Sequence, residues 1–147
     1  MSQITSPQYR KAFILVTTLF FMWGLSYGLI DVLNKHFQEL LTITRTHSAM
    51  IQATMYMGYF IMAIPAGLFI NRHGYRKGVV LGLLLYGIGS LLFIPGQYIA
   101  SFNMFLFSLF VIGCGLTFLE TAANPYVTEL GARETAASRL NFAQSFN

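Results

Sequence analysis

The sequence has 147 residues, of which 55% are apolar, 16% aromatic and 10% charged. Soluble domains average about 45–50% apolar and about 25% charged residues, so this composition argues against disorder, nucleic-acid binding and most soluble enzymes. Nine basic and five acidic residues give a formal net charge of +4, and the whole segment between Lys77 and Glu120 carries no charge. An uncharged run of that length is sufficient for two membrane spans of about 20 residues each.

Four apolar stretches follow one another along the chain, at about 12–33, 48–70, 78–100 and 101–128. Each can cross a hydrocarbon core of about 30 Å as a helix that rises about 1.5 Å per residue. Their apolar residues are continuous rather than alternating, which favours helices over strands. We therefore predict an all-α membrane protein, in which Pro95 and Gly96 mark the end of the third helix.

A fifth helix is expected to begin at about residue 134. Leu140, Ala143 and Phe146 fall on neighbouring turns of such a helix, and no terminating signal follows them. We expect this helix to be truncated in its first turns and the chain to be a fragment of a longer protein.

The basic residues are distributed unevenly between the two sides of the membrane. If residues 1–11 are cytoplasmic, seven basic residues fall on the inner side: Arg10, Lys11, Arg72, Arg76, Lys77, Arg133 and Arg139. Only Lys35 and Arg45 fall on the outer side. Because cytoplasmic loops carry the excess of Lys and Arg, we predict a cytoplasmic N-terminus. The basic clusters are then topology signals, and no nucleic-acid partner is expected.

Two acidic residues lie inside the apolar stretches, Asp31 and Glu120. An ionisable group in a membrane helix is costly and therefore suggests a function. Burial disfavours the charged form of a carboxylate, which is a property that a proton carrier needs. The alternative for each residue is a structural acid that faces a headgroup or a neighbouring helix.

Amide and aromatic side chains accompany these acids. Asn124 follows Glu120 by four residues and so shares its helix face, while Gln144 and Asn147 lie farther along the chain. Tyr27 precedes Asp31 by four residues. Carboxylates, amides and aromatic faces are the groups that bind sugars, although a single tyrosine often only marks the membrane interface or fills space.

No pattern typical of an enzyme is present. The sequence has no metal-binding His and Cys spacing and no phosphate-binding loop, so we expect neither an enzyme nor a cofactor. Cys114 is the only cysteine, which excludes an intramolecular disulfide. Small residues at a spacing of four, which allow helices to approach closely, indicate a packed bundle. These pairs are Gly24 and Gly28, Ala63 and Gly67, and Gly78 and Gly82.

Residues 119–127 (LETAANPYV) and 139–147 (RLNFAQSFN) resemble the fucose and glucose/galactose permeases of the major facilitator superfamily. The resemblance implies that residues 12–147 are part of the N-terminal six-helix half of a twelve-helix transporter, namely its first four helices and the start of the fifth. The C-terminal half would then be the missing partner, because transport sites of this kind lie between two repeats.

The resemblance also implies sugar–proton symport by alternating access across a bacterial inner membrane, with roles for individual residues. Glu120 and Asp31 match acids of the family that take part in proton coupling and substrate binding. Gln144 and Asn147 match amides that face the central cavity. A gating loop between the second and third helices would comprise Gly67, Asn71, Arg72, Gly74, Arg76 and Lys77. Asn71 stands where the family usually has an acid.

Two other functions remain open at this stage. A uniporter or exchanger of the same superfamily would move the sugar without a proton. A membrane scaffold that does not transport, or the product of a pseudogene, would have the same helices. The sugar itself, of the L-fucose, glucose or galactose type, follows from the resemblance alone.

Overall fold

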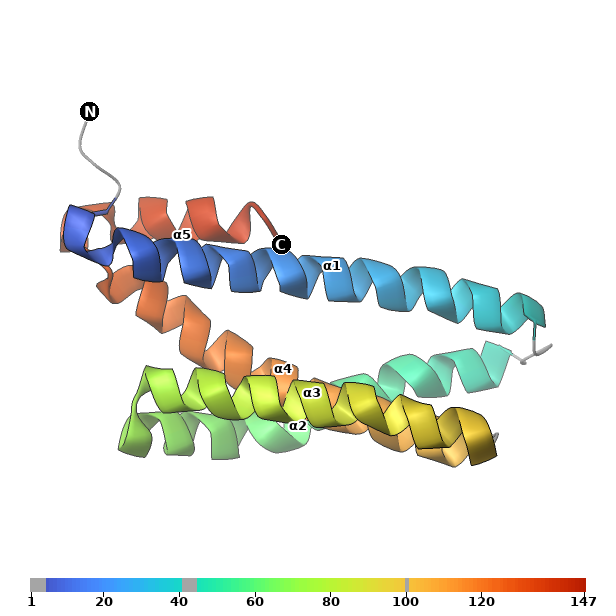
Figure 1. The fold of residues 1–147 in the computed structure, drawn as a ribbon. Coiled ribbons are helices and arrows are strands. Elements are labelled where there is room, and N and C mark those ends of the chain that lie inside the picture. The colour runs from blue at the N-terminus through green and yellow to red at the C-terminus, as the bar shows by residue number, and fades with distance from the viewer. Residues whose placement is uncertain (1–4, 41–44, 100) are drawn as a thin grey trace. The chain divides into compact units, whose positions relative to one another are not determined.

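The computed structural model describes residues 5–40, 45–99 and 101–147, apart from the side chains of residues 26, 29–31, 33–40, 45–48 and 97. Its helices in these ranges are α1 (Arg10–Leu40), α2 (Arg45–His73), α3 (Tyr75–Ile99), α4 (Phe102–Glu129) and α5 (Ala136–Gln144) (Figure 1). Short 3₁₀ turns at Pro7–Tyr9 and Arg133–Thr135 precede α1 and α5. None of the described residues forms a β-strand, so the prediction of an all-α protein is confirmed.

The helices extend beyond the apolar stretches that predicted them. α1 continues to Leu40 rather than ending near residue 33, and α2 begins at Arg45 rather than at residue 48. The added residues of α1 are mostly polar, but none of residues 34–40 is a glycine or a proline, so nothing in them ends a helix. Apolar patterning therefore marks the part of a helix that suits hydrocarbon, and not the helix end.

α3 continues through Pro95 and Gly96 to Ile99, close to the end of the apolar stretch at about residue 100 and two residues beyond the Pro95-Gly96-Gln97 segment expected to mark its end. A proline removes one N–H donor and so frees only the carbonyl group of the residue four positions earlier. Membrane helices tolerate this loss where neighbouring groups compensate. Pro125 likewise lies inside α4.

Three of the described helical segments are long and apolar enough to cross a membrane: Ala49–His73, Tyr75–Gly96 and Phe102–Glu129. The first expected span, at about 12–33, includes side chains that lie outside the described set. Large apolar side chains on α2 point outward, and Phe60 is 85% exposed. Exposed apolar faces of this kind suit contact with lipid rather than with water.

The described residues form two compact units, one within Met1–Val32 and Ala123–Asn147 and the other within Leu33–Ala122. In the first unit, α5 lies alongside the N-terminal part of α1 (Figure 1). Its core is built from α1, the end of α4, and α5, and it consists of Phe13, Val16, Phe20, Ala123, Val127, Leu130 and Ala143. The rings of Phe13 and Phe142 stack across α1 and α5 with centroids 5.9 Å apart.

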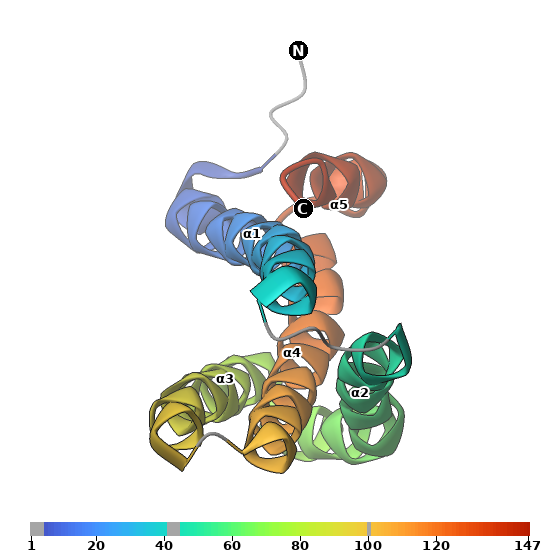
Figure 2. The same cartoon turned by 90° about the vertical axis from the view of Figure 1, so that its right-hand side faces the viewer.

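In the second unit, α2 and α3 flank α4 on opposite sides (Figure 2). A buried cluster of Ala66, Ile70, Phe118 and Ala122 joins α2 to α4, and Val79 and Leu81 of α3 pack against it. The unit thus surrounds α4 with apolar contacts, as expected for a helix in the middle of a bundle.

Glycines allow the helices of this unit to approach closely. A Cβ atom at Gly113 of α4 would lie 2.5 Å from the Met55 carbonyl oxygen of α2, and one at Gly58 would lie 2.7 Å from that of Phe110. On the other side of α4, a Cβ atom at Gly115 would lie 2.8 Å from the Gly82 carbonyl oxygen of α3. Real Cβ atoms do not approach backbone atoms this closely, so both helix pairs depend on glycine.

The small-residue spacings therefore predicted only part of this packing. Gly78 and Gly82 face close neighbours, as expected, whereas a Cβ atom added at Gly28 or at Gly67 would meet nothing within 4 Å. These two glycines lie on helix faces that meet no other described element, so the spacing alone does not identify the face that packs.

Gly74 is the only residue between α2 and α3, because α2 continues to His73 and α3 begins at Tyr75. Its backbone has φ +83°, and its N–H donates to the Ile70 carbonyl oxygen at 2.7 Å, which ends α2 in the left-handed cap typical of glycine. The expected loop of residues 71–77 is thus a single-residue turn. Arg72 lies in the last turn of α2, and Arg76 and Lys77 lie in the first turn of α3.

We expect the substitution Gly74→Ala to lower the free energy of unfolding by about 1–2 kcal/mol, because an L-residue is disfavoured at positive φ. No atom lies within 4 Å of the added methyl group, so the cost is conformational alone. Thermal unfolding in detergent measures it. Gly67→Ala, at an equally open but helical position, is the control and should leave the midpoint unchanged or raised. Equal midpoints for the two variants would contradict the assignment of Gly74 as a left-handed helix cap.

Candidate functional site

Two of the predicted site residues are hydrogen-bonded to each other. The Gln144 Nε2 atom, at the end of α5, donates to the Asn124 Oδ1 atom of α4 at 3.1 Å. Asn124 is partly buried and Gln144 is exposed. Within the described ranges, the NH₂ group of Asn124 and the carbonyl oxygen of Gln144 have no other partner, so the pair presents donors and an acceptor together.

Asn147 lies against α1 at Gly24. A Cβ atom at Gly24 would lie 2.6 Å from the Asn147 carbonyl carbon and 3.1 Å from its Oδ1 atom. Glycine at this position lets the segment after α5 approach the α1 backbone. Asn124, Gln144 and Asn147 all belong to the first unit, and of the three the structure joins Asn124 and Gln144 directly.

Tyr27 lies one helical turn beyond Gly24 on α1 and is partly buried. Its ring is 6.4 Å from that of Trp23, with the two planes tilted by 40°. The spacing to Asp31 indicates Tyr27 as a candidate but does not indicate Trp23. A usable signal is nevertheless present, since Trp23 is the only tryptophan of the sequence and precedes Tyr27 by four residues.

Trp23 carries a buried indole N–H group without a hydrogen-bond partner among the described residues. Its ring stacks on Phe20 with centroids 6.0 Å apart and packs against the core of the first unit. Buried donors are normally satisfied, so an indole N–H group without a partner in the described part of the chain is suited to a polar ligand or to water.

Glu120 lies on α4, one turn before Asn124, and is partly buried. No hydrogen bond or ion pair joins its carboxylate to any residue in the described part of the chain. The nearby hydroxyl groups bond to their own helix instead, because Thr117 donates to the Gly113 carbonyl oxygen at 2.8 Å and Thr121 to that of Thr117 at 2.7 Å. A carboxyl group without a fixed partner can bind and release a proton as its surroundings change.

Asp31 lies in α1, one turn after Tyr27, and its side chain is outside the described set. The gating residues lie on the second unit, with Gly67, Asn71 and Arg72 on α2, Gly74 at the turn, and Arg76 and Lys77 on α3. In the described ranges, no three His, Cys, Asp or Glu side chains are grouped so that they could hold a metal ion.

The sequence profile of the Major Facilitator Superfamily matches residues 12–147. The chain therefore belongs to the Major Facilitator Superfamily and is an integral membrane protein.

Several curated relatives are similar to this chain along nearly its whole length. The L-fucose-proton symporter of Haemophilus influenzae is 43% identical over 146 residues, which cover 99% of this chain and 34% of the relative. The L-fucose-proton symporter of Escherichia coli K12 is 44% identical over 142 residues, covering 97% and 32%. A glucose/galactose transporter of Brucella abortus is 45% identical over 145 residues, covering 97% and 35%.

A crystal structure of the Escherichia coli fucose:proton symporter matches this fold with a TM-score of 0.80 and 42% sequence identity, over 94% of this chain and 33% of that chain. The chain thus spans about a third of the length of the relatives that it matches. These relatives are named as transporters and not as enzymes. The fold expected from residues 119–127 and 139–147 is confirmed.

Proposed function

We propose that this protein takes part in secondary active transport, in which a sugar of the L-fucose, glucose or galactose type crosses a bacterial inner membrane together with a proton. The observation that carries the proposal is the hydrogen bond between the Asn124 and Gln144 amides, three residues before Asn147, which lies against α1 at Gly24. The names of the similar proteins, two L-fucose-proton symporters and a glucose/galactose transporter, support the substrate class.

The amide pair is chemically suited to a sugar. Each sugar hydroxyl group both donates and accepts a hydrogen bond, and the unused functions of Asn124 and Gln144 offer both partners. The indole N–H of Trp23 adds a donor that no described residue occupies. The rings of Trp23 and Tyr27 add flat apolar faces on which the C–H surface of a pyranose can rest.

Proton coupling is assigned to Glu120 and Asp31. Glu120 is on the same helix as Asn124, one turn away, so a change in its charge acts on the helix that carries the amide. A charged carboxylate resists enclosure in a dehydrated cavity, whereas a protonated one does not. Reorientation of the loaded transporter therefore requires the proton, and release of that proton on the other side makes the cycle directional.

The orientation proposed is the one that the basic residues predict, with the N-terminus in the cytoplasm. The α2–α3 turn then lies at the inner surface, where Gly67, Asn71, Arg72, Gly74, Arg76 and Lys77 would gate access. The partner in this gate is a second, C-terminal half, since the binding site of such a transporter is formed between repeats. Lipid surrounds the exposed apolar faces.

Removing either amide of the pair should weaken sugar binding. We expect Asn124→Ala and Gln144→Ala each to raise the KM of sugar uptake about tenfold, because each removes hydrogen bonds worth about 1 kcal/mol or more. Uptake of radiolabelled L-fucose, D-glucose and D-galactose by cells that express the protein from its gene measures this effect.

Asn141→Ala is the matched control, since Asn141 is an exposed amide on the same helix α5. Its KM should stay within about twofold of the unmodified protein. If Asn124→Ala and Gln144→Ala both take up sugar with the KM of the unmodified protein, as Asn141→Ala is expected to do, the amide pair does not bind the sugar.

A further inference from the structure

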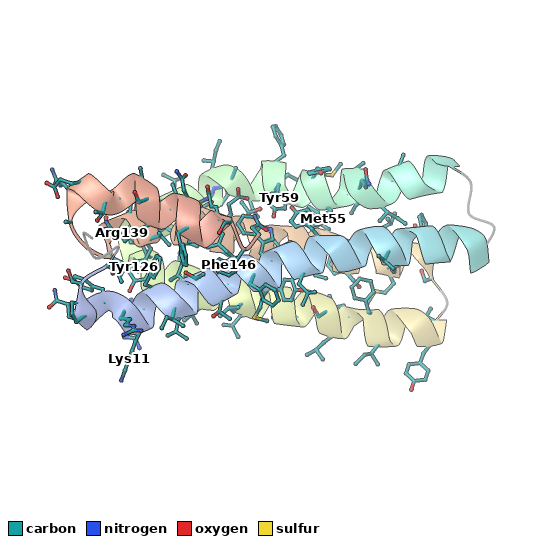
Figure 3. The ribbon with its side chains drawn as sticks, turned by 90° about the horizontal axis from the view of Figure 1, so that it is seen from above. Lys11, Met55, Tyr59, Tyr126, Arg139 and Phe146 are labelled. Carbon is teal, nitrogen blue, oxygen red and sulfur yellow. The ribbon has the colours of Figure 1, made fainter. Side chains whose placement is uncertain are left out.

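Arg139, on α5, is fully buried, with 0% of its side chain exposed. The charge pattern of the sequence places it among the cytoplasmic basic residues, but it is not a surface charge. Its guanidinium group bonds to the end of α4, where Nε donates to the Val127 carbonyl oxygen at 3.2 Å and Nη2 to that of Thr128 at 2.7 Å. Figure 3 shows Arg139 near the start of α5.

These acceptors lie in the last turn of α4, and the Val127 carbonyl oxygen also accepts the Leu130 N–H at 3.3 Å. The last four carbonyl groups of an α-helix have no partner within the helix, and they carry the negative end of the helix dipole. The buried guanidinium group donates hydrogen bonds to such carbonyl oxygens and also places a positive charge at the negative end of the helix dipole. The neighbouring carbonyl group of Leu130 is bonded separately, by the Thr5 hydroxyl at 2.6 Å.

The segment between α4 and α5 is shaped around the same guanidinium group. Gly131 has φ +151°, and a Cβ atom there would lie 2.7 Å from Nη1 of Arg139. Nη1 also donates to the Thr135 hydroxyl oxygen at 2.6 Å, just before α5 begins. Arg139 is therefore fixed to α4, to the connecting segment and to the start of its own helix.

This clamp and the amide pair are successive contacts between the same two helices. Val127 follows Asn124 by three residues on α4, and Gln144 follows Arg139 by five on α5. Between the two contacts lies Ala143, which is fully buried in the core of the unit. The guanidinium contacts and the amide hydrogen bond thus hold α5 against α4 at two successive points along both helices.

We propose that Arg139 is a positioning residue, which holds α5 in register on α4 and thereby sets the Asn124–Gln144 pair in the geometry that binds sugar. Its effect on sugar binding rests on the proposed function, whereas its effect on the register of the helices does not. A cross-linking measurement and a transport measurement separate the two.

The register is measured by the rate at which cysteines introduced by Asn124→Cys and Gln144→Cys are cross-linked, in a Cys114→Ala background and in membranes. Arg139→Gln removes the hydrogen bonds made by a charged donor and should slow the cross-link at least about tenfold. Arg139→Lys keeps the charge but cannot reach both carbonyl groups and the Thr135 hydroxyl, so its rate should be intermediate. Arg133→Gln, an equal loss of charge at an exposed site in the same connection, should change nothing.

Sugar uptake by the same Arg139 and Arg133 variants, made in the unmodified protein, gives the second measurement. We expect Arg139→Gln to raise KM about tenfold with partial recovery in Arg139→Lys, and Arg133→Gln to leave KM unchanged. An unchanged cross-linking rate in Arg139→Gln would overturn the inference. A slowed cross-link with unchanged KM would uphold the positioning of α5 and overturn the role of the amide pair in sugar binding.

If Arg139→Gln fails to insert or fold, Gly131→Ala provides the test, because its methyl group displaces the guanidinium group while all three donors remain. Gly131→Ala should slow the cross-link, as Arg139→Gln does. An unchanged rate in Gly131→Ala would again overturn the inference.

Discussion

Replacement of Glu120 by glutamine should abolish proton-driven sugar accumulation while exchange of sugar across the membrane continues. Glutamine has nearly the shape of a protonated glutamate but cannot release a proton. A transporter locked in the equivalent of its protonated state can still reorient with sugar bound, so counterflow persists. Without deprotonation the proton gradient is no longer coupled, and we expect accumulation to fall at least about a hundredfold, as for the removal of a group essential to one step.

Membrane vesicles with an imposed pH gradient provide the measurement, since the same preparation yields both accumulation and counterflow. Glu134→Gln is the control, because Glu134 is an exposed acid in the connection between α4 and α5. It should behave like the unmodified protein in both assays. Normal accumulation by Glu120→Gln would show that this acid does not couple the proton.

The second large effect is expected on stability, from Gly113→Val on α4. A Cβ atom at this position would lie 2.5 Å from the Met55 carbonyl oxygen, which belongs to the α2 backbone and cannot move aside as a flexible side chain can. The two helices must separate to admit the side chain, which also breaks the close contact of Gly58 with the Phe110 carbonyl oxygen. We expect a loss of about 3 kcal/mol in the free energy of unfolding.

Gly87→Val on α3 is the matched control, since nothing lies within 4 Å of a Cβ atom at Gly87. Thermal unfolding in detergent, followed by the fraction of protein that remains monodisperse, should give a lower midpoint for Gly113→Val and an almost unchanged one for Gly87→Val. Equal midpoints would mean that α2 and α4 are not held together at Gly113.

The helical architecture is predictable from the sequence because a membrane imposes strong constraints. Long uncharged runs can only be spanning helices or barrel strands, and continuous apolar residues favour helices. The ends of the helices are not predictable in the same way. The mostly polar residues 34–40 continue α1, and Pro95 lies inside α3, since helix continuation depends on local backbone preferences and not on hydrophobicity.

Part of the candidate site is also predictable. Asn124 and Gln144 stand out in the sequence as amides near an intramembrane acid, and in the structure they form a hydrogen bond with each other. The position of Trp23, four residues before Tyr27, is a signal in the sequence, but its indole N–H group without a partner among the described residues is a property of the packed structure. The burial of Arg139 is hidden for the same reason, since a sequence does not state that Gly131 leaves room for a guanidinium group against a helix end.

The central proposal, that sugar and proton move together, is tested most directly with a pH electrode. Cells that express the protein, suspended without energy source in weakly buffered medium, receive a pulse of L-fucose, D-glucose or D-galactose. The account predicts that the medium becomes alkaline at once with at least one of these sugars, and that Glu120→Gln removes this response. Sugar uptake without any alkalinisation would contradict symport and would favour a uniporter or exchanger.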